Sequence, residues 1–184
     1  MELGAFPCLS WSNSESSSNQ TLNQFLKIRP SKRWLMLGSH AALCDNQLWT
    51  AWHCSVRRFF RKTSLARTID AEFIRFIAGT HHISEAFQRA GVSDTDVKGW
   101  IIYLPEIQEN NSLDNGMSPS VEYKDNFETT AIGILESLKL TPSYSSLELN
   151  LENADKLGMD INDLDLDDLE DALIGFVLSS EFNN

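Results

Sequence analysis

Two short apolar runs in this sequence have the length and the flanking residues of buried strands. RWLMLGSH at 33–40 closes with Gly38, and GWIIYLP at 99–105 closes with Pro105. A third segment, SSLELNLEN at 145–153, alternates leucine with glutamate or asparagine, which predicts a half-buried strand or an exposed edge. We expect these strands to form a small mixed, mainly antiparallel sheet.

Apolar side chains recur every three or four residues in several other segments, the spacing that places them on one buried face of a helix. These segments are 46–62, 65–78, 80–90, 125–138 and 166–180. Asp45 and Thr80 are the expected N-caps of the first and third helices, and Gly79 and Gly91 are expected to end the second and third. Strands and helices without regular alternation predict an α/β (α+β) domain with helices packed on the sheet.

The 184 residues suffice for one domain with a substantial core. Residues 10–20 are rich in serine and asparagine, so we expect residues 1–25 to be a flexible lead and the domain to span 26–184. Within it, the polar segment 106–124 predicts a long surface loop. The chain lacks a long apolar run and a secretory signal, and its three cysteines are too few for a disulfide framework. We therefore expect a cytoplasmic protein, also nuclear if the source is eukaryotic.

The net charge of -11 is unevenly distributed along the chain. Residues 27–98 hold 12 of the 15 lysines and arginines and only 6 acidic residues, whereas residues 99–184 hold 18 acidic residues and 3 lysines. This asymmetry favours a basic face for a polyanion or an acidic partner. Mutual neutralisation of the two halves within the fold is the alternative.

The basic residues concentrate near the end of the 46–62 helix, where Trp49, Trp52, Phe59 and Phe60 are interleaved with them. The candidate RNA-binding residues are Arg57, Arg58, Arg61, Lys62 and Arg67. Cations can hold a phosphate backbone, and an exposed aromatic ring can stack on a base. The alternative is structural: the helix dipole favours cations at this end, and the helical spacing places Trp52 and Phe59 in the core.

The stretch GTHHISEAF at 79–87 brings His81 and His82 close to Glu85 in the sequence. It lacks the second histidine of an H-x-x-E-H zinc site, and HExxH is absent, so the pattern favours a helix start. A metal-dependent hydrolase using these three residues is the competing hypothesis.

Other candidate metal and nucleotide sites have weaker patterns. The set His40, Cys44, His53 and Cys54 matches no common zinc spacing, and DINDLDLDDLED at 160–171 lacks the glycine and glutamate of a calcium loop. No P-loop, G-x-G-x-x-G or G-x-S-x-G motif occurs. We expect no catalytic residue, no metal and no cofactor.

The segment SLARTIDAEFIRFIAGTHHISEAFQRAG at 64–91 resembles the PRPK-binding protein (TPRKB-like) family, the small regulatory subunit of the KEOPS complex. The motif positions that carry the resemblance are Glu72, Gly79, Thr80, His82, Ile83 and Gly91, where His82 replaces a glutamine frequent in the family. The resemblance extends more weakly over about two thirds of the chain, from the 33–39 strand to KLGMDINDL near the C-terminus.

The resemblance implies a non-enzymatic, mixed α/β domain. Members of this family bind the atypical kinase/ATPase subunit of KEOPS and support threonylcarbamoylation of the tRNA adenosine beside the anticodon, and archaeal relatives bind the CCA end of tRNA. We therefore expect an accessory subunit whose partners are that kinase/ATPase subunit, tRNA and, indirectly, the other KEOPS subunits, with no membrane partner. A protein-binding scaffold without direct RNA contact is the alternative.

Overall fold

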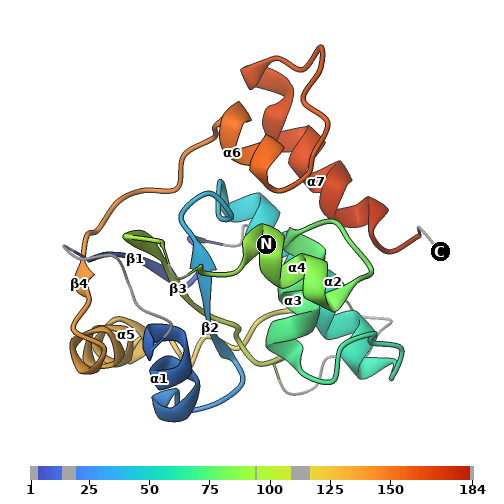
Figure 1. Cartoon of the computed structure of the whole chain (residues 1–184). Coiled ribbons are helices and arrows are strands. Elements are labelled where there is room, and N and C mark those ends of the chain that lie inside the picture. Colours follow the sequence, from blue (N-terminus) through green and yellow to red (C-terminus); the bar gives the residue numbers. More distant parts are fainter. Residues whose placement is uncertain (1–3, 14–19, 94, 109–116, 183–184) are drawn as a thin grey trace.

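The computed structural model describes residues 4–13, 20–93, 95–108 and 117–182. Within these residues, four strands form an antiparallel sheet: β1 (Cys8–Ser12), β2 (Trp34–Gly38), β3 (Lys98–Tyr103) and β4 (Thr141–Pro142) (Figure 1). The strand order is β2-β3-β1-β4. The sheet therefore joins segments that lie as far apart in the sequence as Cys8 and Pro142.

The helices pack on both faces of this sheet (Figure 1). They are α1 (Gln20–Ile28), α2 (Asp45–Phe60), α3 (Ile69–Ile77), α4 (Ile83–Ala90), α5 (Phe127–Ser137), α6 (Leu151–Lys156) and α7 (Leu169–Ser179), with a 3-10 turn at Leu166–Asp168 before α7. Helices α1 and α5 cover one face, and the α2–α4 group covers the other. Helix α7 packs along α2 on the side away from the sheet.

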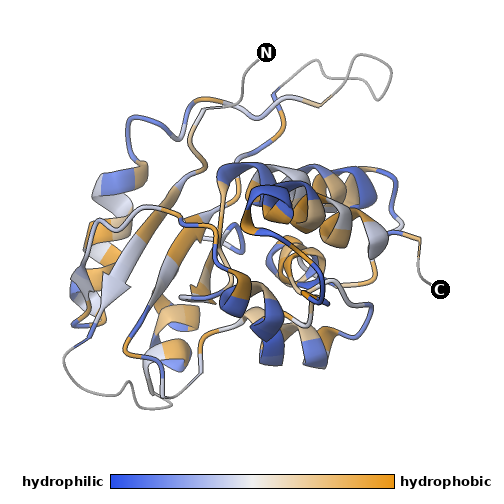
Figure 2. Ribbon diagram, turned by 90° about the horizontal axis from the view of Figure 1, so that it is seen from above, coloured by the Kyte–Doolittle hydropathy of each residue, from blue (hydrophilic) through white to orange (hydrophobic). Residues whose placement is uncertain are grey.

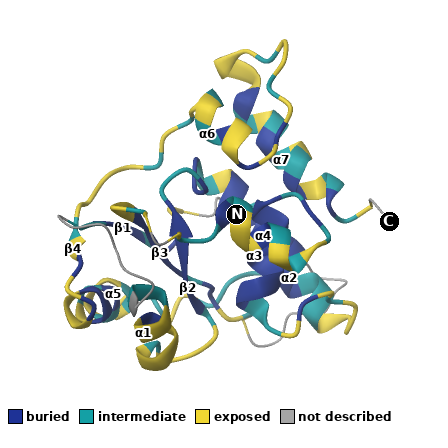
Figure 3. Cartoon of the chain, in the orientation of Figure 1, coloured by how far each residue is buried: buried dark blue, intermediate teal, exposed yellow. Residues whose placement is uncertain are grey.

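Two hydrophobic cores follow from this arrangement, because successive side chains of a strand point to opposite faces. Met36 and Ile101 pack in the core beneath α1 and α5, whereas Leu37 and Ile102 pack in the larger core beneath α2 and α3. Hydrophobic segments gather in the strands and on the helix faces that meet them (Figure 2). As a result β2 and nearly all of α3 are buried, whereas the outer sides of α1 and α5 are exposed (Figure 3).

The mixed α+β fold class and most of the predicted elements are confirmed. The apolar runs at 33–40 and 99–105 form β2 and β3, and the five helical patterns correspond to α2, α3, α4, α5 and α7. The second predicted helix begins later than expected, at Ile69 rather than at residue 65. Its N-cap Thr68 is extended (φ -135°, ψ 150°), and the preceding backbone N–H groups of Leu65 and Ala66 bond to Glu72 instead.

The expected flexible lead at residues 1–25 is wrong for the part that the structure describes. Residues 8–12 form β1, which lies between β3 and β4, and α1 begins at Gln20. The many serines and asparagines in this segment lower its mean hydropathy, although it contains a few large apolar residues. Two of these, Trp11 and Phe25, are almost completely buried. Burial of these large rings stabilises the N-terminal segment on the sheet. Residues 14–19 lie outside the described residues.

The predicted strand at 145–153 is also wrong, although its leucines do face the core. Leu147 and Leu149 are half-buried against the larger core without strand pairing, and Asn150 then caps α6 by accepting the N–H of Asn153. The edge of the sheet is formed by β4 instead. In the expected loop at 106–124, Ile107 and Pro119 form an isolated bridge, and 109–116 lie outside the described residues.

Candidate functional site

The basic cluster predicted from the sequence begins at the C-terminal end of α2, where the chain reverses direction. Lys62 has a positive φ of 57°. The N–H of Lys62 bonds to the carbonyl of Phe59 (3.1 Å), and the N–H of Thr63 bonds to that of Arg58 (2.9 Å). This pair of bonds is the Schellman arrangement that terminates a helix. It directs the following residues over the surface as a loop, 61–68, which leads to α3.

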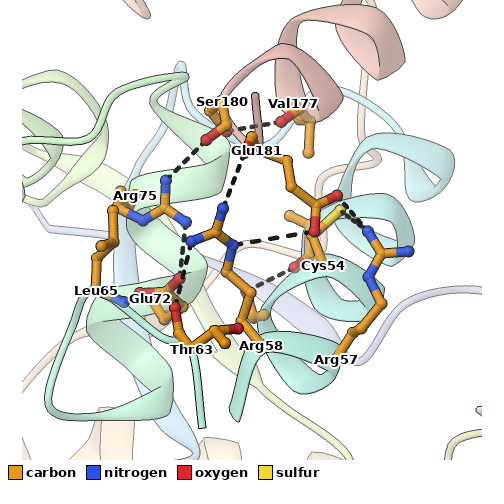
Figure 4. Close-up of polar contacts among 12 residues, drawn as sticks. Cys54, Arg57, Arg58, Thr63, Leu65, Glu72, Arg75, Val177, Ser180 and Glu181 are labelled. Carbon is orange, nitrogen blue, oxygen red and sulfur yellow. Dashed lines mark hydrogen bonds and ion pairs between the residues drawn. The ribbon is translucent and has the colours of Figure 1, made fainter. Parts of the chain in front are cut away.

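This reversal divides the five predicted RNA-binding residues into two groups. Arg57 and Arg58, in the last turn of α2, are partly covered by the C-terminal end of the described chain (Figure 4). Arg61, Lys62 and Arg67 are exposed on the loop and make no ion pair with any described residue. Phe60, the last residue of α2, is 51% exposed. The exposed part of the cluster is therefore the loop itself.

Arg57 and Arg58 are compensated by one acidic residue, Glu181, which lies just after α7. The carboxylate of Glu181 forms an ion pair with Arg57 and lies 4.0 Å from Nε of Arg58. Nη2 of Arg58 also donates to the backbone carbonyl of Glu181 at 2.9 Å. Helix C-termini carry a partial negative charge, which adds to this attraction. The first two predicted cations are thus paired with a counter-charge in the folded chain.

A second ion pair, between Glu72 and Arg75 of α3, is completely buried next to this contact (Figure 4). Nη2 of Arg75 donates to Oε1 of Glu72 at 2.7 Å, and Nη1 donates to the carbonyls of Thr80 (3.3 Å) and Ser180 (3.2 Å). The guanidinium also lies over the ring of Phe76, 4.1 Å from its centroid.

Glu72, the first position of the family motif, connects the loop 61–68 to α3. Its Oε2 accepts the N–H groups of Leu65 (3.1 Å) and Ala66 (2.8 Å). A buried charge is tolerated only when it is paired and hydrogen-bonded. The Glu72–Arg75 pair therefore ties the basic loop, the start of α4 and the end of α7 to α3.

The next motif position, Gly79, ends α3 as expected. Its φ is +59°, and the bonds from Gly79 N–H to Phe76 and from Thr80 N–H to Arg75 repeat the Schellman arrangement. A Cβ on Gly79 would lie 2.2 Å from the ring of Phe176 in α7. Glycine is required here both by the backbone conformation and by the close approach of α7.

Two expected N-caps differ from the structure. His82, not Thr80, is the N-cap of α4, and its side chain makes no capping bond. The hydroxyl of Thr80 instead accepts the N–H of His82 (3.2 Å) and donates to Glu85. These two bonds fix the backbone just before α4 begins. For α2, the N-cap is Cys44 rather than Asp45, whose carboxylate accepts the N–H of Phe6 (2.6 Å).

The remaining motif positions confirm the ordinary start and end of α4. Ile83 is its first residue, and the helix ends at Gly91, whose N–H bonds to the carbonyl of Phe87 (3.0 Å). His82 is exposed to solvent. These residues position the chain between α3 and β3.

Glu85 and His81, two of the three residues of the hydrolase hypothesis, have different surroundings in the structure. Glu85 is held by Thr80 and by Nη2 of Arg89 at 2.6 Å, and these contacts lower the pKa of its carboxyl group. Burial lowers the pKa of His81, and the nearby positive charges of Arg75 and Arg58 lower it further. In the described ranges, no group of three or more His, Cys, Asp or Glu side chains could hold a metal ion.

Cys44, Cys54, His40 and His53, the other candidate metal ligands, have structural surroundings. Burial raises the pKa of Cys54 to about 11 and that of Cys44 to about 11, so both thiols stay protonated at neutral pH. Nε2 of His40 lies 2.6 Å from the carbonyl of Arg89, and the ring of His53 packs against Trp52. These contacts stabilise the fold.

Sequence reasoning missed Ser180 and Glu181, the residues that meet the three arginines of α2 and α3. Glu181 is 124 positions from Arg57, and no local pattern connects them. The apolar stripe of α7 predicts that the helix packs, but it does not specify α2 as its neighbour.

Comparison with known proteins identifies the family. The family model described as kinase binding protein CGI-121 matches residues 12–141, a range that contains α1–α5, the basic loop and all six motif positions. No curated protein matches the chain at a significant level. No helix in the described part of the chain is long and apolar enough to cross a membrane. The family description indicates a partner-binding role rather than a catalytic one, and the chain belongs to the kinase binding protein CGI-121 family.

Proposed function

We propose that this protein is a non-catalytic accessory subunit of a KEOPS-type complex. In this role it binds the atypical kinase/ATPase subunit and the CCA end of tRNA, and so supports the synthesis of tRNA threonylcarbamoyladenosine. The family match over residues 12–141 supports the kinase partner, and the resemblance at 64–91 supports the particular complex.

The exposed loop after α2 is the observation that carries the RNA-binding part of the proposal. Arg61, Lys62 and Arg67 present three positive charges that pair with no acidic side chain in the described part of the chain, close in sequence to the half-exposed ring of Phe60. Such charges attract phosphates without reading sequence, and an exposed aromatic ring stacks on an unpaired base. The single-stranded end of a tRNA offers both groups together.

Arg57 and Arg58 have a smaller part in this proposal than the sequence indicated. Their interaction with Glu181 leaves less positive potential for a phosphate. We therefore assign the main RNA contact to Arg61, Lys62 and Arg67. Arg57 and Arg58 instead stabilise the C-terminal end of α2 through their contact with Glu181.

A pull-down with the purified kinase/ATPase subunit, with intact tRNA and with tRNA lacking its CCA end tests the proposal. We expect the protein to retain the kinase subunit and to retain intact tRNA better than the shortened tRNA. Kinase binding without any tRNA binding would favour the alternative, a protein-binding scaffold whose basic loop meets an acidic partner. Failure to bind the kinase subunit would contradict the KEOPS assignment.

A further inference from the structure

A row of four aromatic rings, those of Trp34, Tyr103, Tyr123 and Phe127, lines an open cleft of about 370 Å³. They belong to the start of β2, the end of β3 and the chain at the start of α5, elements that are labelled in Figure 1. Trp34 lies at the centre of the row, with ring centroids 5.0 Å from Tyr103 and 5.6 Å from Phe127, and Tyr103 lies 5.7 Å from Tyr123. Trp34 and Tyr103 are cross-strand partners. The rings of Tyr103, Tyr123 and Phe127 are only half-buried, so the row is accessible from the cleft.

Among the residues that line the cleft, the charged one is Glu122. Glu122 lines the cleft and is exposed, and its side chain pairs with no described residue. Burial raises the pKa of Tyr103, and the charges of Glu106 and Glu122 act in the same direction. Burial likewise raises the pKa of Tyr123, so both phenols stay neutral at physiological pH.

The nearby cation, Arg33, does not neutralise Glu122. Its Nε forms an ion pair with Glu106 at 3.2 Å, and its Nη1 donates to the backbone carbonyls of Leu104 (3.1 Å) and Pro105 (3.0 Å). These bonds hold Arg33 against the chain that follows β3. Arg33 lowers the pKa of Tyr103, whereas Glu106 and Glu122 raise it. Because Arg33 is paired with Glu106, Glu122 is the member of this group that has no ion-pair partner among the described residues.

We propose that this cleft binds an arginine side chain presented by a partner protein. A guanidinium is planar, so it stacks on the face of a tyrosine or phenylalanine ring while its N–H groups donate to the carboxylate of Glu122. A lysine ammonium lacks that planar face and is more strongly hydrated, so it gains less from the rings. A nucleotide would stack equally well, but its phosphates would meet a negative local charge.

This site is separate from the proposed RNA contact. It shares no residue with the loop 61–68, and its ligand carries the opposite charge from a phosphate backbone. The cleft is also lined by Glu122, Tyr123 and Asn126, which precede α5 and lie inside the range matched by the family. The arginine site and the tRNA site can therefore be tested independently, and either can fail without the other.

Titration of the full-length protein with capped Gly-Arg-Gly peptide, followed by NMR chemical shifts of Tyr103, Tyr123 and Asn126, tests the proposal. The matched probe replaces arginine by citrulline, which is planar and similar in size but uncharged. We expect saturable shifts at these residues with the arginine peptide and about tenfold weaker binding of the citrulline peptide, because the cation–π and carboxylate interactions both require the charge. Equal binding of the two peptides, or no shifts with arginine, would overturn the proposal.

Two variants locate the effect. Glu122→Gln should weaken the arginine peptide several-fold, on the order of the loss of one ion pair, and leave the citrulline peptide unchanged. Glu128→Gln, an exposed acidic residue in the first turn of α5 outside the cleft, is the matched control and should leave both affinities unchanged. Equal effects of the two substitutions would show that the peptide responds only to the net charge of the protein, and would contradict a specific arginine site. Stronger binding of adenosine monophosphate than of the arginine peptide would show a base-stacking site instead and overturn the proposal.

Discussion

The carboxylate of Glu181 forms an ion pair with Arg57, 124 residues earlier in the chain, and so places the end of α7 on the basic end of α2. Arg58 contributes a hydrogen bond to the backbone of the same residue. This contact decides which of the clustered cations remain available to a ligand. It also links the segment after residue 141 to the part of the chain that the family model matches.

Substitution of Glu181 by glutamine tests this contact. We expect Glu181→Gln to lower the free energy of unfolding by about 1 kcal/mol, since the pair is only partly shielded from solvent. The same change frees the charges of Arg57 and Arg58, so it should increase tRNA affinity and make it more salt-dependent. Chemical denaturation and binding titrations at two salt concentrations measure both effects.

Glu136→Gln is the matched control, because Glu136 is exposed on α5 and forms no ion pair with a described residue. It changes the net charge equally but should leave stability unchanged. If Glu181→Gln behaves like this control in both assays, the contact has no influence on the basic cluster.

The buried pair of Glu72 and Arg75 should be far more sensitive. Glu72→Ala leaves the guanidinium of Arg75 without its counter-charge in a fully buried position, and we expect a loss of about 3–5 kcal/mol in the free energy of unfolding. Urea denaturation measures this loss.

The double variant Glu72→Leu/Arg75→Met should recover part of it, because no lone charge stays buried. Recovery will be incomplete, since the carbonyls of Thr80 and Ser180 lose their donor. A single Glu72→Ala variant as stable as the wild type would contradict the structural role assigned to this motif position.

Gly79 and Gly133 offer a matched pair of glycine substitutions. Gly79→Ala should destabilise strongly, because alanine is strained at φ +59° and its Cβ would collide with Phe176. Gly133 lies inside α5 with open space around its Cα, so Gly133→Ala should stabilise by about 0.5–1 kcal/mol. Thermal unfolding of the two variants checks the prediction, and the same sign of change for both would refute it.

Acid should weaken the fold through His53 and His81. Burial lowers the pKa of both below the ordinary value of 6.5, and the charges of Arg57 and of Arg75 respectively add to the shift. The unfolded chain therefore takes up protons at a higher pH than the folded chain, so stability is full above about pH 6.5 and declines as the pH falls below it.

Denaturation at several pH values between about 7.5 and 5.5 measures this decline. In His81→Gln, one of the two titrating groups is absent, and we expect a shallower slope than in the wild type. An unchanged slope would show that His81 titrates normally. His82→Gln is the control, since His82 is the neighbour of His81 in the sequence but its side chain is exposed.

Local sequence patterns predicted the parts of the fold that local physics determines. Leu48, Trp52 and Val56 recur at helical spacing and are buried in α2, and the apolar run around Leu37 forms β2. β1 was not predicted, because its five residues depend on pairing with β3, about ninety positions later, for their stability. Sheet partners are chosen by long-range packing, which periodicity does not encode.

The candidate site was predicted in the same partial way. The sequence pattern identified Arg61, Lys62 and Arg67 as clustered cations but placed them in helices predicted over 46–62 and 65–78, whereas α2 ends at Phe60 and α3 begins at Ile69, so that all three lie on the loop between them. The separation of Arg57 and Arg58 from them follows from Glu181, and the aromatic cleft depends on rings from β2, β3 and the turn before α5. Both relationships join distant segments, so only the folded chain reveals them.

The most direct measurement of the central proposal is the affinity of intact tRNA and of tRNA lacking CCA for two charge-matched variants. The first, Arg61→Gln/Lys62→Asn/Arg67→Gln, removes the exposed loop charges, with asparagine chosen because it tolerates the positive φ of Lys62. The control, Lys27→Gln/Lys32→Gln/Lys124→Gln, removes three exposed charges elsewhere. We predict that the loop variant loses about tenfold or more in affinity for intact tRNA, with a shallower salt dependence, and that the control retains most of it. Equal affinities of the two variants, or no preference of the wild type for tRNA with its CCA end, would contradict the proposal.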